Sequence, residues 1–270
     1  MASSILPAEG VTIEFIARCL ARVLLQPVVT GALFLASLRA PSRYREIVNL
    51  LSKDRINPTY LSRTIVALIA AGVTYRLNNA IARRVLNNWT SDNTWNWDRE
   101  IVLVTGGCSG IGEVVVRKLS ERNIKVAIFD VAEPRSPLPP RVSFYKVDIT
   151  SSEAIQEAAQ KVRKEIGDPT VLVNNAGIGA NKPILSETEA QIRATFNVNI
   201  VAHFLLVREF VPYMIKQDHG HIVTIASMAS FVVHASNVDY ACTKAAALAF
   251  HEGLAQELKA KYHAKKVRTT

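Results

Sequence analysis

From residue 101 onward, short apolar runs alternate with stretches whose apolar positions recur at helical spacing. The runs predict strands at 101–105, 125–130, 142–148, 170–177 (with its turn), 221–227 and 267–270. The helical stretches are 110–120, 152–165, 187–216 (as one helix or two) and 237–262. Continuously apolar strands that are separated by helices indicate a parallel sheet covered on both faces. The pattern therefore predicts an α/β fold with a doubly wound parallel sheet, the Rossmann arrangement, and a ligand crevice at the carboxyl ends of its strands.

Two apolar blocks dominate the first third of the chain, at residues 23–38 and 64–75, and arginines flank both. Each block is shorter than the roughly 20 apolar residues that a spanning helix needs. A segment that crosses a bilayer usually has more basic residues on one side than on the other, whereas here every flank is basic. We therefore favour a monotopic hairpin or interfacial anchor. The alternatives are two true spans, or a buried helical pair packed on the next domain.

The segment 87–100 is polar, rich in turn-forming residues, and carries Trp89, Trp95 and Trp97. These properties predict a linker. The tryptophans fit either a bilayer interface or the edge of the next domain, and both alternatives stay open. The predicted organisation is thus a membrane-anchoring segment with its linker over residues 1–97 and a Rossmann domain over residues 98–270.

The composition favours a membrane over nucleic acid as partner. Hydrophobic residues make up 49% of the 270 residues, and the formal net charge is +9. Most of this excess lies in residues 1–97, which hold eleven Lys/Arg against five Asp/Glu. These arginines alternate with long aliphatic runs and accompany no nucleic-acid-binding motif, so a membrane surface is the expected partner. The three cysteines are far apart, which predicts neither a metal site nor a disulfide framework and fits a reducing compartment.

The first chemical motif, VLVTGGCSGIG, runs from the first predicted strand into the first helix of the α/β region. Its glycines Gly106, Gly110 and Gly112 are spaced differently from the common G-x-G-x-x-G dinucleotide motif. They lie where a pyrophosphate can meet backbone N–H groups and a helix N-terminus. Asp130 ends the second strand, where a carboxylate can bind ribose hydroxyls and repel a 2′-phosphate, and Ser109 offers no compensating positive charge. The motif therefore predicts NAD rather than NADP, unless Asp130 is only a solvated acid at a strand end.

A second motif combines Ser227 with Tyr240 and Lys244. The last two residues are four positions apart and share one face of a predicted helix. A free tyrosine has a pKa of about 10, and a neighbouring lysine ammonium lowers it and favours the ionised form that can act as a base. Ser227 ends the fifth strand and can hold a substrate oxygen there, although a serine in that position can also be a simple cap. The glycine loop, the strand-end acid, the strand-end serine and the Y-x-x-x-K motif, in that order in one α/β frame, are a far more specific signal than Y-x-x-x-K alone.

In this order the motifs resemble the short-chain dehydrogenase/reductase family over about residues 99–270: T-G-x-x-x-G-x-G, N-N-A-G, Ser227 and Y-x-x-x-K. The resemblance implies an NAD(P)-dependent enzyme that acts on CH–OH groups without a metal. It implies four catalytic residues, Asn199, Ser227, Tyr240 and Lys244. Asn199 would hold a water that relays protons through Lys244, unless it is only a polar residue that kinks its helix.

The resemblance also implies a set of cofactor contacts. Asp148 would touch the adenine, and the turn at Asn174 would brace the central sheet. The residues expected to contact NAD are Thr105, Gly106, Ser109, Gly110, Ile111, Gly112, Asp130, Asp148, Ile149, Asn175, Ala176, Gly177, Tyr240 and Lys244.

Within the family, the apolar and basic N-terminus followed by W-x-W and EIVLVTGG resembles the membrane-bound branch of epidermal retinal dehydrogenases and lipid-droplet 17-beta-hydroxysteroid dehydrogenases. That branch implies a lipophilic substrate, namely a retinoid, a sterol or a long-chain alcohol. It also implies attachment to the endoplasmic reticulum or to lipid droplets, with the catalytic domain in the cytosol, and it admits a homodimer.

Family members continue past the last predicted strand with further strands and a substrate-covering segment, whereas this sequence ends at Thr270. We therefore expect a sheet without its C-terminal strands. Two rival functions stay open. One is a membrane-anchored, non-catalytic Rossmann scaffold protein, and the other is an NADPH-dependent ketoacyl reductase, against which Asp130 argues.

Overall fold

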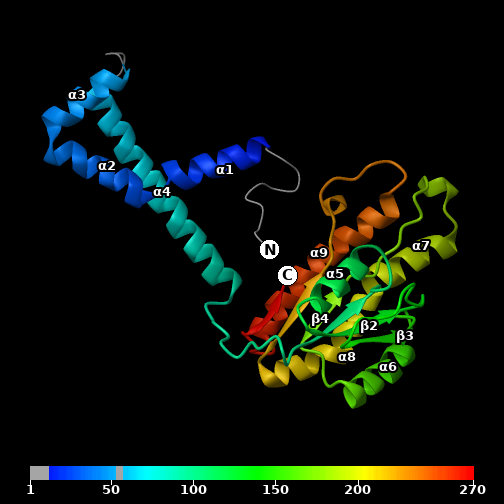
Figure 1. Ribbon diagram of the computed structural model, residues 1–270. Coiled ribbons are helices and arrows are strands. Elements are labelled where there is room, and N and C mark those ends of the chain that lie inside the picture. The colour runs from blue at the N-terminus through cyan, green and yellow to red at the C-terminus, as the bar shows by residue number, and fades with distance from the viewer. Residues whose placement is uncertain (1–11, 53–56) are drawn as a thin grey trace. The chain divides into compact units, whose positions relative to one another are not determined.

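The computed structural model describes residues 12–52 and 57–270. The chain divides into two compact units, Met1–Leu86 and Asn87–Thr270, which are described separately (Figure 1). The described residues of the first unit form helices, and those of the second form a sheet covered by helices. Residues 87–97, which the sequence analysis assigned to the linker, lie in the second unit.

The first unit holds, among its described residues, α1 (Ile13–Leu24), α2 (Pro27–Arg39), α3 (Pro41–Ser52) and α4 (Pro58–Leu86). Helices α2, α3 and α4 begin at a proline, whose missing N–H would have no partner in a first helical turn. Helix α2 packs on α4. At Gly72 of α4 a Cβ would come within 2.6 Å of the Leu25 carbonyl oxygen. The helices that carry the two apolar blocks therefore pack on each other.

Helix α4 is longer than the apolar block within it. It runs for 29 residues and is long and apolar enough to cross a membrane, and only 11% of its most apolar stretch is buried. The block at 64–75 is too short to span when counted alone, but the helix extends beyond it at both ends. A second stretch of similar length and apolarity, Glu189–Gln217, is 44% buried and belongs to the second unit.

The second unit is built on six parallel strands. They are β1 (Ile101–Thr105), β2 (Lys125–Asp130), β3 (Val142–Lys146), β4 (Val171–Asn174), β5 (Gly220–Thr224) and β6 (Val267–Thr269). Their spatial order is β3-β2-β1-β4-β5-β6, so the chain builds outward from β1 in one direction and then from β4 in the other. The doubly wound parallel sheet predicted from the apolar pattern is confirmed.

Helices cover both faces of this sheet (Figure 1). On one face lie α6 (Ser152–Glu165), α8 (Ala202–Gln217) and α9 (Val238–Ala260), and on the other lies α5 (Gly110–Ser120). Because strand side chains alternate between faces, Leu103 of β1 enters the first layer. Its neighbours Val102 and Val104 enter the second.

The stretch 187–216, predicted as one helix or two, contains two helices. Helix α7 (Glu189–Phe196) and helix α8 are joined by a π-helical segment, Asn197–Val201. A π-helical turn inserts one extra residue and rotates the side chains that follow. The apolar pattern contains no signal for this insertion, which places Asn199 in the core with no exposed surface.

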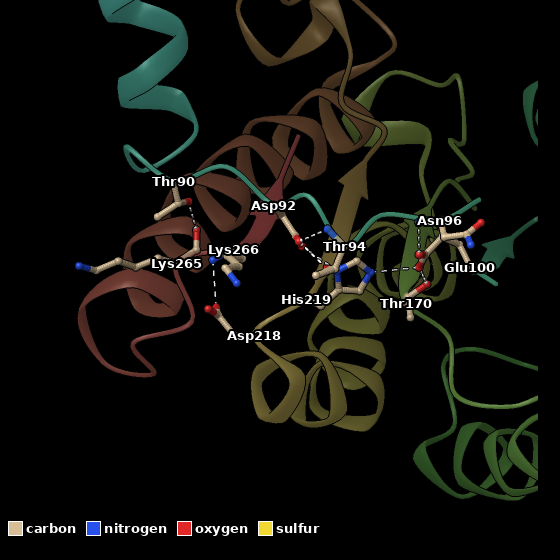
Figure 2. A network of polar contacts seen from close by, with 10 residues as sticks. All are labelled: Thr90, Asp92, Thr94, Asn96, Glu100, Thr170, Asp218, His219, Lys265 and Lys266. Atoms are coloured by element: carbon tan, nitrogen blue, oxygen red, sulfur yellow. Dashed lines mark hydrogen bonds and ion pairs between the residues drawn. The ribbon is translucent and has the colours of Figure 1, made fainter. Parts of the chain in front are cut away.

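The connector, which we define as residues 87–100, belongs to the second unit and is hydrogen-bonded to the rest of it (Figure 2). The side chains of Asn88 and Thr90 each donate a hydrogen bond to the carbonyl oxygen of Lys265. These bonds join positions more than 170 residues apart in sequence. The polar, turn-rich composition that predicted a linker therefore forms a bonded extension of the sheet unit.

The three tryptophans of the connector differ in their surroundings. Trp95 packs against the α5-side core and lies on His219, with 4.3 Å between the ring centroids. It thus follows the second alternative, packing on the edge of the domain. Trp89 and Trp97 keep 61% and 51% of their surface exposed.

His219 joins two carboxylates of the connector (Figure 2). Its Nδ1 lies 2.7 Å from Asp92, and its Nε2 lies 3.1 Å from Glu100. Thr170 donates a hydrogen bond to Glu100. Because His219, Thr170 and Glu100 directly precede β5, β4 and β1, these contacts tie together the amino ends of three neighbouring strands. We call Asp92, Glu100, Thr170 and His219 the clasp.

The clasp favours a positive imidazolium between two negative carboxylates. Its charged side chains are nearly enclosed, with 15% of His219, 5% of Glu100 and none of Asp92 exposed. Burial by itself disfavours charge on His219, but its hydrogen bonds with Asp92 and Glu100 outweigh that effect and raise its pKa. Burial also works against the charge of Asp92, yet hydrogen bonds from Thr94 and His219 lower its pKa to about 2.

Candidate active site

A cavity of about 410 Å³ lies at the carboxyl ends of the strands. It is placed where the strand order reverses, between β1 and β4, which is the usual ligand position in such sheets. The lining residues are Gly106, Ser109, Gly110, Ile111, Phe129, Asp130, Val131, Val147, Asp148, Ile149, Asn175, Ala176, Gly177, Ile178, Val198, Ile225, Tyr240 and Lys244. All residues predicted to contact NAD are among them except Thr105 and Gly112.

Thr105 and Gly112 lie behind this lining and hold it in place. Thr105 is buried, and its Oγ1 accepts hydrogen bonds from the backbone N–H groups of Asn175 and Ala176. The end of β1 is thereby tied to the turn after β4. A Cβ on Gly112 would lie 2.1 Å from the carbonyl oxygen of Gly106, so only glycine lets α5 start this close to the loop.

The glycine loop leaves an open cradle where α5 begins. Gly110 has a φ of +55°, and a Cβ on it would meet no atom within 4 Å. Ser109 occupies the N-cap position but makes no side-chain capping bond, so the first N–H groups of α5 lack that acceptor. A helix N-terminus carries partial positive charge and suits a pyrophosphate. The residues present therefore fit a bound dinucleotide.

Asp130 fixes the glycine loop and retains acceptor capacity. Its Oδ2 accepts a hydrogen bond from the N–H of Cys108, and its Oδ1 accepts one from Ala132. Each oxygen of an ionised carboxylate has a further lone pair, so both can still accept a ribose hydroxyl. Burial and the charge of Asp130 raise the pKa of the Cys108 thiol to about 11, which keeps this thiol protonated.

Tyr240 and Lys244 project from α9 and border the same cavity. The Lys244 side chain is almost fully buried, and its Nζ lies 5.5 Å from the centre of the Tyr240 ring. Burial lowers the pKa of Lys244. Its ammonium donates one hydrogen bond of 2.6 Å, to the carbonyl oxygen of Ile225. An ammonium has three donors, so further ones are available to a ligand.

Asn199 holds the loop that follows β4. Its Oδ1 accepts from the N–H of Ile178, and its Nδ2 donates to the carbonyl oxygen of Ile178, both at 2.8 Å. Nδ2 also lies 3.0 Å from the hydroxyl of Thr243 on α9. Asn199 is thus outside the cavity lining and touches it through Ile178. Its expected part in a proton relay stays a prediction.

Ser227 lies just beyond β5 and begins a short 3₁₀ turn, Met228–Ser230. Its Oγ accepts a hydrogen bond from the N–H of Ala229, so the hydroxyl hydrogen is left for another acceptor. The turn packs on α9, where Ser230 donates to the carbonyl oxygen of Lys244. The capping role and the oxygen-holding role proposed for Ser227 are therefore compatible.

Three other predicted residues have distinct surroundings. Asp148 is exposed, and its Oδ1 accepts two hydrogen bonds from Thr150. Ile149, beside it, is buried and apolar, as one side of an adenine site would be. Asn174 is buried at the end of β4, but its side-chain amide makes no hydrogen bond in the described structure. The turn that it begins is bonded to the end of β1 through Asn175, whose Nδ2 donates to the carbonyl oxygens of Thr105 and Gly106.

Six lining residues were not anticipated, and all are apolar: Phe129, Val131, Val147, Ile178, Val198 and Ile225. Most of them adjoin a predicted site residue in sequence, so their place in the lining could have been predicted from that proximity. One further residue near the site was not anticipated. Asp239 is not part of the cavity lining, but it is buried and directly precedes Tyr240.

The comparisons with known proteins agree with this geometry. A model of the short chain dehydrogenase family matches residues 100–268. The chain belongs to the short chain dehydrogenase family. The match covers β1 to β5, most of β6, the glycine loop, Asn199, Ser227, Tyr240 and Lys244, so the predicted oxidoreductase class is confirmed at the level of the family.

Two relatives show how far the similarity extends. The chain is 45% identical to dehydrogenase RED2 of Cochliobolus heterostrophus over 225 residues, which cover 82% of this chain and 84% of RED2. It is 38% identical to estradiol 17-beta-dehydrogenase 11 of Mus musculus over 169 residues, which cover 60% of this chain and 57% of that protein. The second similarity agrees with the resemblance to the 17-beta-hydroxysteroid dehydrogenase branch.

Solved structures of other short chain dehydrogenases bear on the cofactor. The chain is similar to 4-hydroxyisoleucine dehydrogenase complexed with NADH, with a TM-score of 0.57 and 25% identity over 63% of this chain and 72% of that one. It is also similar to a metagenomic short-chain oxidoreductase in complex with NADP, with a TM-score of 0.56 and 30% identity over 63% of this chain and 79% of that one. A nicotinamide dinucleotide is thus the cofactor class of the family, and the choice between NAD and NADP depends on this chain's own residues.

Proposed function

We propose that this protein is a membrane-attached oxidoreductase that transfers a hydride between NAD(H) and a lipophilic alcohol or its carbonyl form. One observation carries the proposal: Tyr240 and Lys244 border the same cavity as the open glycine loop and Asp130. A tyrosine and a lysine beside a dinucleotide cradle supply proton transfer where hydride transfer takes place.

Each site residue then has a defined task. The dinucleotide, when bound, accepts or donates the hydride. In oxidation, the alcohol loses its hydroxyl proton to the Tyr240 oxygen as its carbon–hydrogen bond breaks and the carbonyl forms. The positive charge of Lys244 stabilises negative charge on that oxygen during proton transfer, and its remaining donors bind the nicotinamide ribose. Ser227 donates its hydroxyl hydrogen to the substrate oxygen, and Asn199 supports a proton relay through Lys244.

The preference for NAD follows from the charges around the cavity. Asp130 lies where the adenosine ribose binds, and a 2′-phosphate there would meet its negative charge. Within the described lining, Lys244 is the only cation, and it belongs to the nicotinamide end. Asp130 also has free lone pairs for the two ribose hydroxyls of NAD.

A membrane setting is supported by the first unit and by the surroundings of the site. Helix α4 is long, apolar and poorly buried. In the second unit, Leu185 is 100% exposed on the loop after β4, and Met228 and Phe231 are 75% and 71% exposed on the loop after β5. These apolar surfaces suit a retinoid, sterol or long-chain alcohol that partitions into the same lipid. We propose the endoplasmic reticulum or lipid droplets as the location, with the second unit in the cytosol.

A homodimer is supported by a largely apolar groove that is lined mainly by residues of α8 and α9. The groove has a volume of about 850 Å³ and is lined by Phe204, Val207, Phe250 and Tyr262, among others. Phe204 and Tyr262 keep 54% and 50% of their surface exposed. A second copy of the same face would bury this surface.

The decisive experiment compares Tyr240→Phe with Tyr213→Phe, a matched removal of a hydroxyl elsewhere in the second unit. The proteins are assayed in lipid vesicles with NAD⁺ and, in turn, retinol, a sterol and a long-chain alcohol. Tyr240→Phe should lower turnover by roughly 10²–10⁴-fold, the usual contribution of positioned acid–base catalysis, while NADH binding stays within twofold. Near-normal turnover would refute the mechanism. If the unmutated protein bound NADH but turned over none of the alcohols, the scaffold alternative would replace it.

The anchor is tested by removing residues 1–86. The cut ends before the connector because residues 87–100 are bonded to the second unit. The remaining chain should stay in solution and bind NADH, whereas the full chain should float with vesicles in a density gradient. Flotation of the shortened protein would show that the first unit is not the anchor.

A further inference from the structure

A short loop after β4 forms one wall of the cavity and also touches Tyr240. We call residues 177–180 the wall loop. Gly177 and Ile178 line the cavity. Gly179 lies against the tyrosine ring, because a Cβ built on it would be 3.4 Å from Cβ and Cδ2 of Tyr240. The path of this loop therefore determines both the shape of the cavity wall and the space available to the Tyr240 ring.

Two buried polar side chains hold the wall loop, one on each side of Gly179. Asn199 bonds both backbone groups of Ile178. Asp239 holds the other end, because its Oδ2 accepts a hydrogen bond of 3.3 Å from the N–H of Ala180. The same oxygen accepts one of 2.9 Å from the hydroxyl of Thr195 on α7.

Asp239 is unusual for a residue in the first turn of a helix. Such acids normally face solvent, where they favour the helix N-terminus, whereas Asp239 is 6% exposed. Its Oδ1 is buried without a hydrogen-bond partner, and no described cation pairs with the carboxyl group. An unsatisfied buried oxygen lowers stability. This cost is understandable if the carboxyl group performs a task that an apolar side chain could not.

We infer that Asp239 is a positioning residue, which fixes the wall loop against Tyr240 and thereby sets the cavity wall and the orientation of the tyrosine. It touches neither substrate nor cofactor. Because Asp239 directly precedes Tyr240 on α9, one rigid turn carries both the tyrosine and the group that holds the loop packed on its ring. This inference rests on the proposed function of the cavity.

Three variants test it. Asp239→Ala removes both hydrogen bonds. Asp239→Asn keeps an oxygen that can accept them and places an amide nitrogen at the unsatisfied position. Thr195→Val removes only the hydroxyl donor and leaves the bond to Ala180, so it reports the effect of disturbing the same buried cluster without releasing the loop.

Each variant is measured by NADH titration, by kcat and KM, by the pH dependence of kcat/KM, and by thermal unfolding. For Asp239→Ala we expect NADH affinity to fall about tenfold. The N–H of Ala180 loses its acceptor, and the wall loop that lines the cavity is no longer held in place. We expect kcat to fall about 100-fold, since small misplacements of a catalytic group have effects of that size. The KM for the alcohol should change little, and the acid limb of the pH profile of kcat/KM should move. Asp239→Asn and Thr195→Val should stay within about threefold in affinity and kcat.

Two results would overturn the inference. In the first, Asp239→Ala is folded and keeps NADH affinity and kcat within twofold, which would leave the carboxyl group a purely structural role. In the second, Asp239→Asn is as impaired as Asp239→Ala, which would mean that charge rather than hydrogen bonding matters. If Asp239→Ala does not fold, Asp239→Ser replaces it, because its shorter side chain cannot reach both partners. If the unmutated protein binds no NADH, the proposed function fails and the inference with it.

Discussion

At the amino edge of the sheet the polar side chains are bonded to one another, whereas at the carboxyl edge several have bonding capacity to spare. Asp92, Glu100 and His219 enclose one another's charges at the amino edge. At the carboxyl edge, Ser109 makes no capping bond and Lys244 has one acceptor for its three donors. Both edges nevertheless contain buried ionisable groups with shifted pKa values.

The difference teaches that a shifted pKa does not by itself mark a functional site. At the clasp the shift is accounted for by protein partners, so the group stabilises the fold. At the cavity, burial lowers the pKa of Lys244, and the donors that it does not use for Ile225 are available to a ligand in the cavity that it lines. Unused hydrogen-bonding capacity, combined with a cavity, separates the two edges.

The largest effect is expected from Gly112→Ala at the carboxyl edge. The new Cβ would lie 2.1 Å from the Gly106 carbonyl oxygen, so α5 must move away from the loop. The free energy of unfolding should fall by about 3 kcal/mol, and NADH binding should be lost. Urea unfolding and NADH titration measure both. Gly253→Ala in α9 is the control, because open space there predicts a gain of up to about 1 kcal/mol. Normal NADH binding by Gly112→Ala would contradict the described cradle.

At the amino edge, His219→Leu is expected to lower the stability of the protein. Removing the imidazole leaves Asp92 and Glu100 enclosed without their cation, which should lower the free energy of unfolding by about 3 kcal/mol. NADH affinity should stay within twofold, because the clasp lies at the opposite ends of the strands. His234→Leu, at an exposed histidine, should change stability by less than about 0.5 kcal/mol. A loss of NADH affinity in His219→Leu would break the separation between the two edges.

A smaller effect is expected from Asp130→Asn. The variant weakens the charge-assisted hydrogen bonds to the ribose, so NADH affinity should fall about tenfold, equivalent to about 1.4 kcal/mol. NADPH affinity should rise, because a 2′-phosphate no longer meets a negative charge. Fluorescence titration with both cofactors measures the difference between NADH affinity and NADPH affinity. Asp98→Asn, at an exposed acid of the connector, is the control. Tighter binding of NADPH than NADH by the unmutated protein would show that Asp130 does not select NAD.

The smallest effect is the pH dependence of the clasp. Because the pKa of His219 is raised above 6.5, its stabilising contribution is complete below pH 6.5 and declines as the pH rises through the raised value. Because the pKa of Asp92 is lowered from 3.8 to about 2, its contribution is complete above pH 3.8 and declines as the pH falls through about 2. The clasp is therefore at full strength between these limits.

The measurement is the difference in unfolding free energy between the unmutated protein and His219→Leu. This difference removes the effect of His203, whose pKa is lowered to about 4 by burial and by the charge of Lys244 and which therefore favours the folded state at higher pH. The difference should be constant from pH 3.8 to 6.5 and shrink above that range. A difference that grew with rising pH would contradict the assigned charges.

Much of the second unit was predictable from local pattern. Continuous apolar runs such as 101–105 and 125–130 predicted the strands, and their alternation with helices predicted a doubly wound parallel sheet. The cavity followed because Gly106 and Asp130 lie at the carboxyl ends of β1 and β2, and Tyr240 lies in the first turn of α9. The positions of such residues could be predicted from the neighbouring sequence alone.

The rest depends on contacts between distant parts of the chain. The composition of the connector predicts a linker, because a local pattern cannot reveal a contact with a distant residue. Asp92 contacts His219, which is 127 residues away in the sequence. Asp239 has the same difficulty, since an acid in a first helical turn has an ordinary local explanation. The π-helical segment at Asn199 is a third case, because it packs on α9, which lies far from it in sequence.

The clasp also orders events during synthesis of the protein on the ribosome. The connector leaves the ribosome before any strand of the sheet, but the imidazole that neutralises Asp92 and Glu100 is made much later, just before β5. Until then the first unit is joined to an incomplete sheet by a chain whose charges face water. Formation of the amino edge is thus a late step that closes a long loop, at an entropic cost that only the finished sheet can offset. A nascent chain should accordingly be cleaved by a protease within the connector, and the completed protein should resist at the same place.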